Sequence, residues 1–252
     1  MTDSLIDYLL GDLPDAPVQT VLIGAHWTAV VVQIGGRRRC GLATSLRSEA
    51  DHHHSAGHAV PGAGRLHLKS GLELARLVHS ASPPEVSVGM AAINALLPPH
   101  EQAWVDLNAQ EVITERGAGK HVALVGHFPF VPQLRERVGQ LSVLELRPRG
   151  DDLPADAAPD IIPRADVVAI TSLTLMNDTF EELVRLCRPD ALVLLLGPTT
   201  PLSPLLFHYG VHILSGSVVE DVNAVLNAVA QGGNFRQVHR AGVRLVTMTR
   251  NT

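Results

Sequence analysis

Residues 120–146 read KHVALVGHFPFVPQLRERVGQLSVLEL, and this stretch decides the fold of the second half of the chain. Two continuous apolar runs, His121–Gly126 and Leu141–Leu146, enclose a segment with helical spacing from about Val131 to Gly139. Such runs are typical of strands that are covered on both faces and joined by right-handed crossovers. The stretch therefore predicts a β-α-β unit of a parallel sheet.

The same alternation of apolar runs and helical spacing continues toward the C-terminus. Further strands are predicted at 167–171, 191–196, 211–215 and 244–248, and further helices at about 179–187, 203–208 and 219–231. This succession is typical of an open sheet with helices on both faces. We therefore predict a Rossmann-like parallel-sheet domain over residues 108–252.

The first half of the chain follows a different pattern. Three runs rich in β-branched residues, with Gly35-Gly36 between the last two, predict a meander at 18–24, 28–34 and 37–44. A polar, exposed loop is expected at 45–65, and helices at 71–79, 87–97 and 109–116. The predicted fold class is α/β, with an α+β domain over residues 1–107.

Composition excludes several classes of protein. Of the 252 residues, 46% are hydrophobic and 18% are charged, which favours a packed core over disorder. A net charge of −5 without a basic stripe argues against a nucleic-acid partner. The chain has no secretion signal, no membrane-spanning run and no Cys-x-x-Cys pair, so we expect a cytoplasmic protein without a membrane partner. The sequence does not determine the oligomeric state, and a homo-oligomer is one of the alternatives.

Candidate site residues follow the predicted strands. In open parallel sheets, ligands bind beyond the carboxyl ends of the strands, where the strand order reverses. Four loops are therefore expected to converge on one crevice, and they lie at 126–130, at Glu145, at 171–179 and at 197–201. His127 is the histidine that this rule places in the crevice.

Two of these positions have more than one interpretation. Glu145 stands about 20 residues past Gly126, where an acidic side chain accepts hydrogen bonds from ribose hydroxyls in Rossmann sheets; pairing with Arg147 or Arg149 is the alternative. Asn177 is either a ligand contact or an ordinary helix-capping residue. The first loop has only one glycine of the dinucleotide fingerprint, which argues against a dinucleotide.

A histidine cluster marks the polar loop of the first half. Residues 51–58 read DHHHSAGH, and their imidazoles are ligands that Zn, Ni, Cu and Fe favour. The spacing matches no defined structural zinc pattern, so a polar loop with incidental affinity is the alternative. The candidate metal ligands here are His52, His53, His54 and His58.

Five strings carry a family resemblance: VGMAAINA at 88–95, VGHFP at 125–129, LEL at 144–146, the segment 171–179, and LGPTTPLSP at 196–204. Together they resemble the bacterial and archaeal family described as heavy-metal chelation proteins, over nearly the whole chain. The resemblance implies an N-terminal domain similar to that of enolase, a Rossmann-like second domain and a ligand site in the cleft between them. The family's motif residues then correspond to Asn94, His127, Glu145, Thr171, Asn177, Gly197, Pro198 and Thr199. The histidine cluster lies outside these motifs.

Two functional hypotheses follow. The first is a protein that binds a heavy metal or a metal chelate in the interdomain cleft, with His127, Glu145 and Asn177 as polar contacts and Zn, Ni, Cu or Fe as the metal. The alternative is a transferase-like enzyme that uses a nucleoside-type cofactor such as S-adenosylmethionine, with Glu145 on the ribose and His127 as acid or base. A scaffold without a ligand ranks last, since it leaves the proline-rich loop at 197–204 unexplained.

Overall fold

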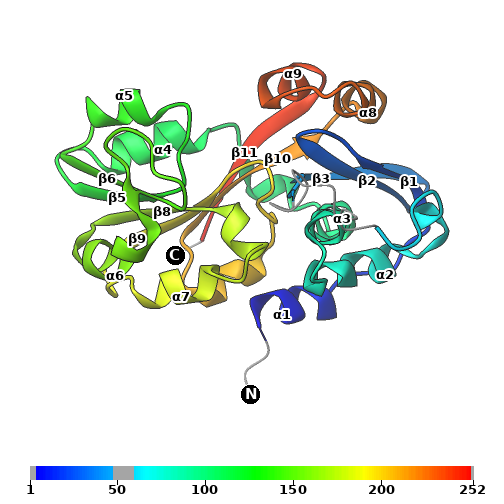
Figure 1. The fold of residues 1–252 in the computed structure, drawn as a ribbon, viewed down its shortest axis with the longest axis horizontal. Coiled ribbons are helices and arrows are strands. Elements are labelled where there is room, and N and C mark those ends of the chain that lie inside the picture. The colour runs from blue at the N-terminus through cyan, green and yellow to red at the C-terminus, as the bar shows by residue number, and fades with distance from the viewer. Residues whose placement is uncertain (1–3, 48–59, 251–252) are drawn as a thin grey trace, which may run out of the picture. The chain divides into compact units, whose positions relative to one another are not determined.

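The computed structural model describes residues 4–47 and 60–250 of the chain (Figure 1). The chain divides into two compact units, the first made of residues 1–99 and 217–244 and the second of residues 100–216 and 245–252. The domain boundary predicted between residues 107 and 108 stays a prediction.

The first unit is built on the expected meander. Strands β1 (Val18–Ile23), β2 (Trp27–Ile34) and β3 (Arg37–Thr44) form an antiparallel sheet in that order. Gly35 and Gly36 make the turn between β2 and β3 with φ of 57° and 76°, a conformation that favours glycine. The first six residues of β2 are buried, because helices cover both faces of this sheet.

Helices from distant parts of the chain supply that cover. Helix α3 (Pro83–Leu96) packs on β2 and β3, while α8 (Val222–Ala230) and α9 (Phe235–Arg240) bury the opposite face around Trp27 and Leu42. The remaining α-helices described in this unit are α1 (Leu5–Gly11) and α2 (Gly71–Ala75), the latter continued by a 3₁₀ turn at Arg76–His79.

Two helix predictions for this unit need correction. Helix α3 begins at Pro83 and not at residue 87, because proline is favoured in the first turn, where its missing N–H has no intrahelical partner to lose. The segment predicted as a helix at 219–231 begins as a strand, and α8 starts after Asp221, whose side chain accepts a hydrogen bond from the Ala224 N–H. Helix α9 was not predicted.

The larger sheet has eight strands in the order β4-β11-β10-β9-β8-β5-β6-β7. The pairs from β10 to β7 are parallel, and β11 pairs with β4 antiparallel, so the sheet is mixed and mostly parallel. This architecture confirms the α/β class. The strands are β4 (Trp104–Val105), β5 (His121–Val125), β6 (Gln140–Glu145), β7 (Leu153–Pro154), β8 (Val167–Thr171), β9 (Leu192–Leu196), β10 (Ile213–Val219) and β11 (Val243–Thr249).

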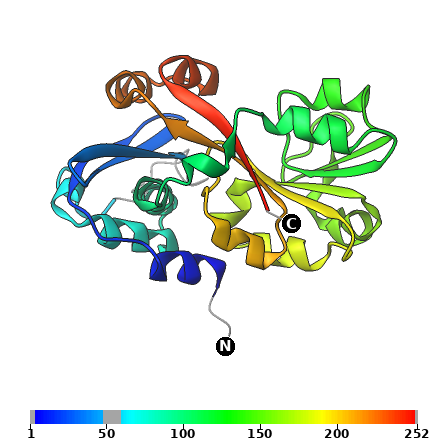
Figure 2. The same ribbon diagram turned by 180° about the vertical axis from the view of Figure 1, so that it is seen from behind.

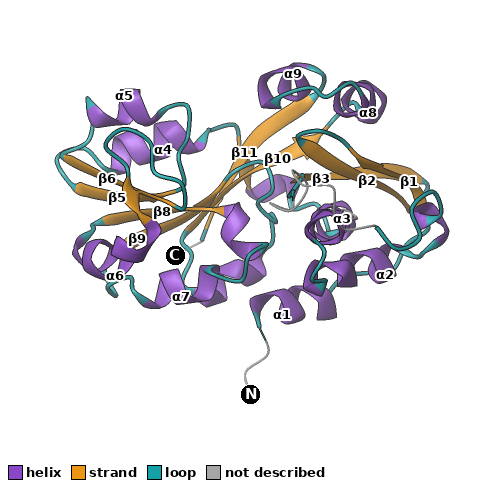
Figure 3. Cartoon of the chain, viewed as in Figure 1, coloured by secondary structure: helices purple, strands orange, loops and turns teal. Residues whose placement is uncertain are grey.

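Helices lie on both faces of the parallel strands, as Figure 3 shows and the reverse view in Figure 2 confirms. Helices α4 (Ala109–Arg116) and α5 (Val131–Arg135) share a core of valine, leucine and isoleucine with strands β5, β6 and β8. Helices α6 (Ala158–Ile161) and α7 (Phe180–Arg185) lie on the other face. Helices α5 and α7 are shorter than predicted, and β7 and α6 were not predicted.

The strand order reverses between β5 and β8. From β5 the chain adds β6 and β7 on one side, and then returns to place β8, β9 and β10 on the other. In open parallel sheets such a reversal leaves a crevice at the carboxyl ends of the strands. Among the described residues, no helix is long and apolar enough to cross a membrane.

Candidate functional site

A cavity of about 520 Å³ lies at the carboxyl ends of β5, β6 and β8, within the second unit. This volume is in the range of small-molecule sites, and the position is the strand-order reversal. The wall combines aliphatic side chains with a few polar ones. Its lining includes Val125, Gly126, His127, Phe128, Leu144, Glu145, Leu146, Ala155, Asp156, Ala158, Pro159, Thr171, Leu173, Thr174, Asn177, Thr179, Glu182, Leu183 and Leu186.

Gly126 and Thr171 bring two strand ends together beside this cavity. Gly126 has φ of 99°, and a Cβ added to it would lie 3.1 Å from the Thr171 Cβ. The Gly126 N–H also donates a hydrogen bond to the Leu144 carbonyl at 2.8 Å, which ties the end of β5 to β6. The positive φ therefore favours glycine at position 126, and an added Cβ would make a tight contact with Thr171.

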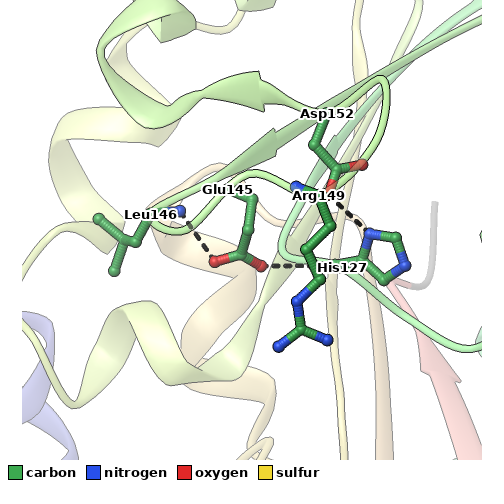
Figure 4. A network of polar contacts seen from close by, with 5 residues as sticks. All are labelled: His127, Glu145, Leu146, Arg149 and Asp152. Carbon is green, nitrogen blue, oxygen red and sulfur yellow. Dashed lines mark hydrogen bonds and ion pairs between the residues drawn. The ribbon is translucent and has the colours of Figure 1, made fainter.

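Glu145 holds the backbone that follows β5 and β6. Its Oε2 accepts a hydrogen bond from the His127 N–H at 2.8 Å, and its Oε1 accepts one from the Leu146 N–H at 2.8 Å (Figure 4). A carboxylate has about four acceptor positions, so a ligand hydroxyl can still donate to Glu145. Glu145 thus shapes the loop that carries His127, and it lines the cavity.

His127 forms a side-chain pair with Asp152, a residue that the sequence reasoning missed. His127 Nδ1 and Asp152 Oδ2 lie 2.7 Å apart, and the His127 side chain is 31% exposed while the Asp152 side chain is 1% exposed. The Arg149 N–H donates to the same Asp152 oxygen at 3.1 Å. The available signal was an acidic pair, Asp151-Asp152, in the turn that follows the strand ending at Glu145.

Asn177 lines the cavity and also caps a turn. Its Oδ1 accepts hydrogen bonds from the Thr179 N–H at 3.3 Å and the Thr179 hydroxyl at 2.7 Å. Between them, Asp178 has φ of 58°, the left-handed region that aspartate tolerates better than most residues. Both interpretations of Asn177, as capping residue and as cavity residue, are therefore compatible with its position.

Other predicted site residues lie elsewhere. Gly197, Pro198 and Thr199 are not among the lining residues, and Thr199 is buried. Gly197 borders the site indirectly, since a Cβ added to it would lie 3.0 Å from the Ser172 hydroxyl, next to Thr171. Asn94 belongs to the first unit, where its Nδ2 donates to the Leu42 carbonyl at 2.9 Å and fastens α3 to β3. The four histidines at 52, 53, 54 and 58 lie outside the described residues.

The donor set of the cavity is one imidazole with carboxylates. His127, Glu145, Asp156 and Glu182 line it, and no lysine or arginine is among its described lining residues. Among the described residues, no group of three or more His, Cys, Asp or Glu side chains is placed to hold a metal ion. The described lining therefore offers one imidazole nitrogen and several carboxylate oxygens, but no protein-only set of ligands for a metal ion.

The fold and the cavity define an α/β protein with a strand-end pocket, and comparison with known proteins places it in a family. Residues 108–248 match the family model DUF364 and residues 6–97 match DUF4213, and both models are described as "Putative heavy-metal chelation". The first match alone covers more than half of the chain, so the chain belongs to this family. The family expected from the sequence strings is confirmed.

Individual relatives agree with this assignment. An uncharacterized protein of Methanocaldococcus jannaschii is 27% identical over 213 residues, which span 79% of this chain and 78% of that protein. A DUF364 protein of unknown function from Desulfitobacterium hafniense, known from its crystal structure, is 27% identical with a TM-score of 0.81 over 98% of both chains. A second such structure, from Pyrococcus horikoshii, is 20% identical with a TM-score of 0.78 over 98% of both chains, and it shows the fold alone.

Proposed function

We propose that the protein binds a heavy-metal chelate, an organic molecule that carries its own metal ion, in the strand-end cavity. The observation that carries the proposal is the cavity itself, which gathers His127, Glu145, Thr171 and Asn177 at the strand-order reversal. The family description supports heavy-metal chelation as the chemistry. The cleft between the domains, where the resemblance places the site, stays a prediction.

The wall of the cavity favours an organic ligand with a particular charge. Leu144, Leu173, Leu183 and Leu186 offer an apolar surface to the body of such a ligand. The carboxylates of Asp156 and Glu182 are not balanced by a basic side chain among the described lining residues. A neutral or cationic complex is therefore favoured over an anionic one.

The metal remains one of the borderline ions Zn, Ni, Cu or Fe. These ions bind imidazole nitrogen well, and the described lining supplies one imidazole, that of His127. When bound, the ion would contribute Lewis acidity or redox chemistry, and the protein would contribute a site that orients the complex.

Purified protein without a His tag tests this proposal. Metals are measured by elemental mass spectrometry and organic ligands by native mass spectrometry, in a background where His52, His53, His54 and His58 are replaced by asparagine. We expect metal and organic ligand to be retained together at equal stoichiometry in this background. Loss of all metal with the four histidines would instead place the metal site in that cluster and contradict the proposal.

Filling the cavity gives a matched pair of variants. Ala155 lines the cavity, whereas Ala157 of the same 3₁₀ turn does not, and both are half-buried. We expect Ala155→Phe to abolish ligand retention and Ala157→Phe to leave it unchanged. Equal retention by both variants would place the ligand elsewhere.

A second candidate is an enzyme with a nucleoside-type cofactor such as S-adenosylmethionine. The observation that favours it is that Glu145 at the end of β6 and Gly126 at the end of β5 line the same cavity, as ribose-binding residues do in Rossmann sheets. Titration with S-adenosylmethionine and nucleosides, followed by thermal shift, distinguishes the candidates. The absence of any shift would count against the enzyme.

A further inference from the structure

The His127–Asp152 pair fixes which ring nitrogen is available to a ligand. An ionised carboxylate only accepts hydrogen bonds, so Nδ1 of His127 must carry the proton that it donates to Asp152 Oδ2 across 2.7 Å. In the neutral ring, Nε2 then carries the lone pair. Figure 4 shows Nδ1 facing Asp152 and Nε2 on the opposite side of the ring.

We propose that Asp152 is a positioning residue that holds His127 in this tautomer, and that His127 Nε2 coordinates the metal of the bound chelate. This inference rests on the proposed function and names how the site would engage its ligand. In metal sites the ligating histidine usually donates its other N–H to a carboxylate or a carbonyl, which fixes the ring and raises its basicity.

The other ring nitrogen of His127, Nε2, is the candidate ligand atom. Within the described part of the chain, His127 Nε2 takes part in no hydrogen bond or ion pair. The His127 side chain is 31% exposed and lines the cavity. By contrast, His121 at the start of β5 uses both ring nitrogens, contacting the Arg164 carbonyl at 3.3 Å and the Ser142 hydroxyl at 3.0 Å. His127 is therefore oriented through Nδ1, and the described residues leave Nε2 without a partner.

The buried carboxylate favours a positive charge close to it. Asp152 has a side chain that is 1% exposed, and His127 is its only ion-pair partner among the described residues. Its Oδ1 is buried without a hydrogen-bond partner in the same part of the chain. A buried carboxylate needs compensation by an opposite charge, and an imidazole bound to a metal cation provides it next to Oδ2.

A second histidine–aspartate pair serves as the internal control. His79 Nε2 and Asp7 Oδ1 lie 3.0 Å apart in the first unit, with side chains 46% and 50% exposed. This pair lies on the surface, and exposed pairs of this kind contribute little to the stability of the folded protein. A tautomer or a metal contact that depends on a buried carboxylate and on the cavity should therefore not be observed at His79.

The tautomer is tested first, by long-range ¹H–¹⁵N correlation spectra of the full chain labelled at histidine. We expect the Nδ1–H tautomer for His127 in the unaltered protein and a changed tautomer in Asp152→Asn, whose amide can donate to Nδ1. The His79 signals should not move. An Nε2–H tautomer for His127 in the unaltered protein would overturn the inference.

Coordination is tested with copper(II)–terpyridine, a planar cationic chelate with one open equatorial position, in the background lacking His52, His53, His54 and His58. A remote imidazole nitrogen modulates the electron spin echo of copper only when imidazole binds the metal. We expect this modulation in the background protein, its loss in His127→Ala, and its retention in His79→Ala. The affinity should fall about 10–100-fold in Asp152→Asn, the usual effect of removing a carboxylate partner.

The outcomes separate this inference from the proposed function. If the chelate binds, Ala155→Phe blocks it, and His127→Ala and Asp152→Asn leave affinity and spectra unchanged, the inference is overturned while the cavity keeps its proposed role. If no chelate of this charge binds the protein that lacks the four histidines, the result contradicts both this inference and the proposed function. Circular dichroism of each variant verifies that folding is intact.

Discussion

Several candidate side chains hold backbone in place with the same atoms that a ligand would use. Asn94 donates to the Leu42 carbonyl, Asn177 accepts from Thr179, and Glu145 accepts from the N–H groups of His127 and Leu146. Each of these contacts positions a loop or a helix. At the residue scale, the best candidates for ligand contacts are polar atoms that have no partner among the described residues, and His127 Nε2 is the clearest case.

His212 gives a pH-dependent prediction at this scale. Its Nδ1 accepts a hydrogen bond from the Val193 N–H at 3.1 Å, and burial followed by the charge of Arg250 lowers the pKa of His212 below 6.5. The unfolded chain therefore binds this proton at a higher pH than the folded chain does. We expect the free energy of unfolding to fall as the pH drops below 6.5.

Urea denaturation of the unaltered protein and of His212→Asn, from about pH 7.5 to about pH 5, measures this effect. The asparagine can accept the same hydrogen bond but does not titrate. The variant should lose the part of the pH dependence that His212 contributes. Identical slopes for the two proteins would contradict the prediction.

At the element scale, α3 packs very closely on β3 in the first unit. A Cβ added to Gly41 of β3 would overlap the backbone of Ala91 and Ala95 in α3. Small residues on both elements let the helix lie directly on the strand. Two elements packed this tightly tolerate little added volume.

Replacing Gly41 by alanine should therefore destabilise the protein by about 1–3 kcal/mol, because backbone rather than a flexible side chain must move. Gly11 of α1 provides the control, since a Cβ added there meets nothing within 4 Å. Gly11→Ala should change stability by less than about 0.5 kcal/mol. Chemical denaturation of both variants makes the comparison, and equal effects would show that α3 and β3 are less closely packed.

At the scale of the whole molecule, the first unit is assembled from two distant parts of the chain. Residues 217–244 join residues 1–99, and they bring α8 and α9 onto the face of the meander that carries Trp27 and Leu42. The apolar side chains on that face are buried by Val225, Val229 and Val238. This unit is therefore not one continuous range of the sequence.

A fragment of residues 1–107 tests that dependence and the predicted domain boundary together. Without α8 and α9 the apolar face is exposed, so we expect the fragment to bind a hydrophobic dye and to aggregate. Joining residues 217–244 through a flexible linker should restore a cooperative thermal transition. A fragment 1–107 that unfolds cooperatively without them would support the boundary between 107 and 108.

The sequence by itself determined the elements with local signals. Continuous apolar runs predicted β5, β8 and β9, β-branched runs with Gly35-Gly36 predicted the meander, and the strand-end rule selected Gly126, His127, Glu145 and Thr171, which line one cavity. Periodicity and turn chemistry act over a few residues, so they are legible without a structure. Family strings supplied the heavy-metal chelation hypothesis.

Only the tertiary structure decided which distant side chains meet. Asp152 lies 25 residues from His127 and became its partner through the turn after β6, while Gly197 and its neighbours remained outside the cavity lining. Helices α8 and α9 pack on the meander, from which almost two hundred residues separate them in the sequence. Such pairings depend on packing and on the burial of polar groups far apart in sequence, and no local pattern encodes them.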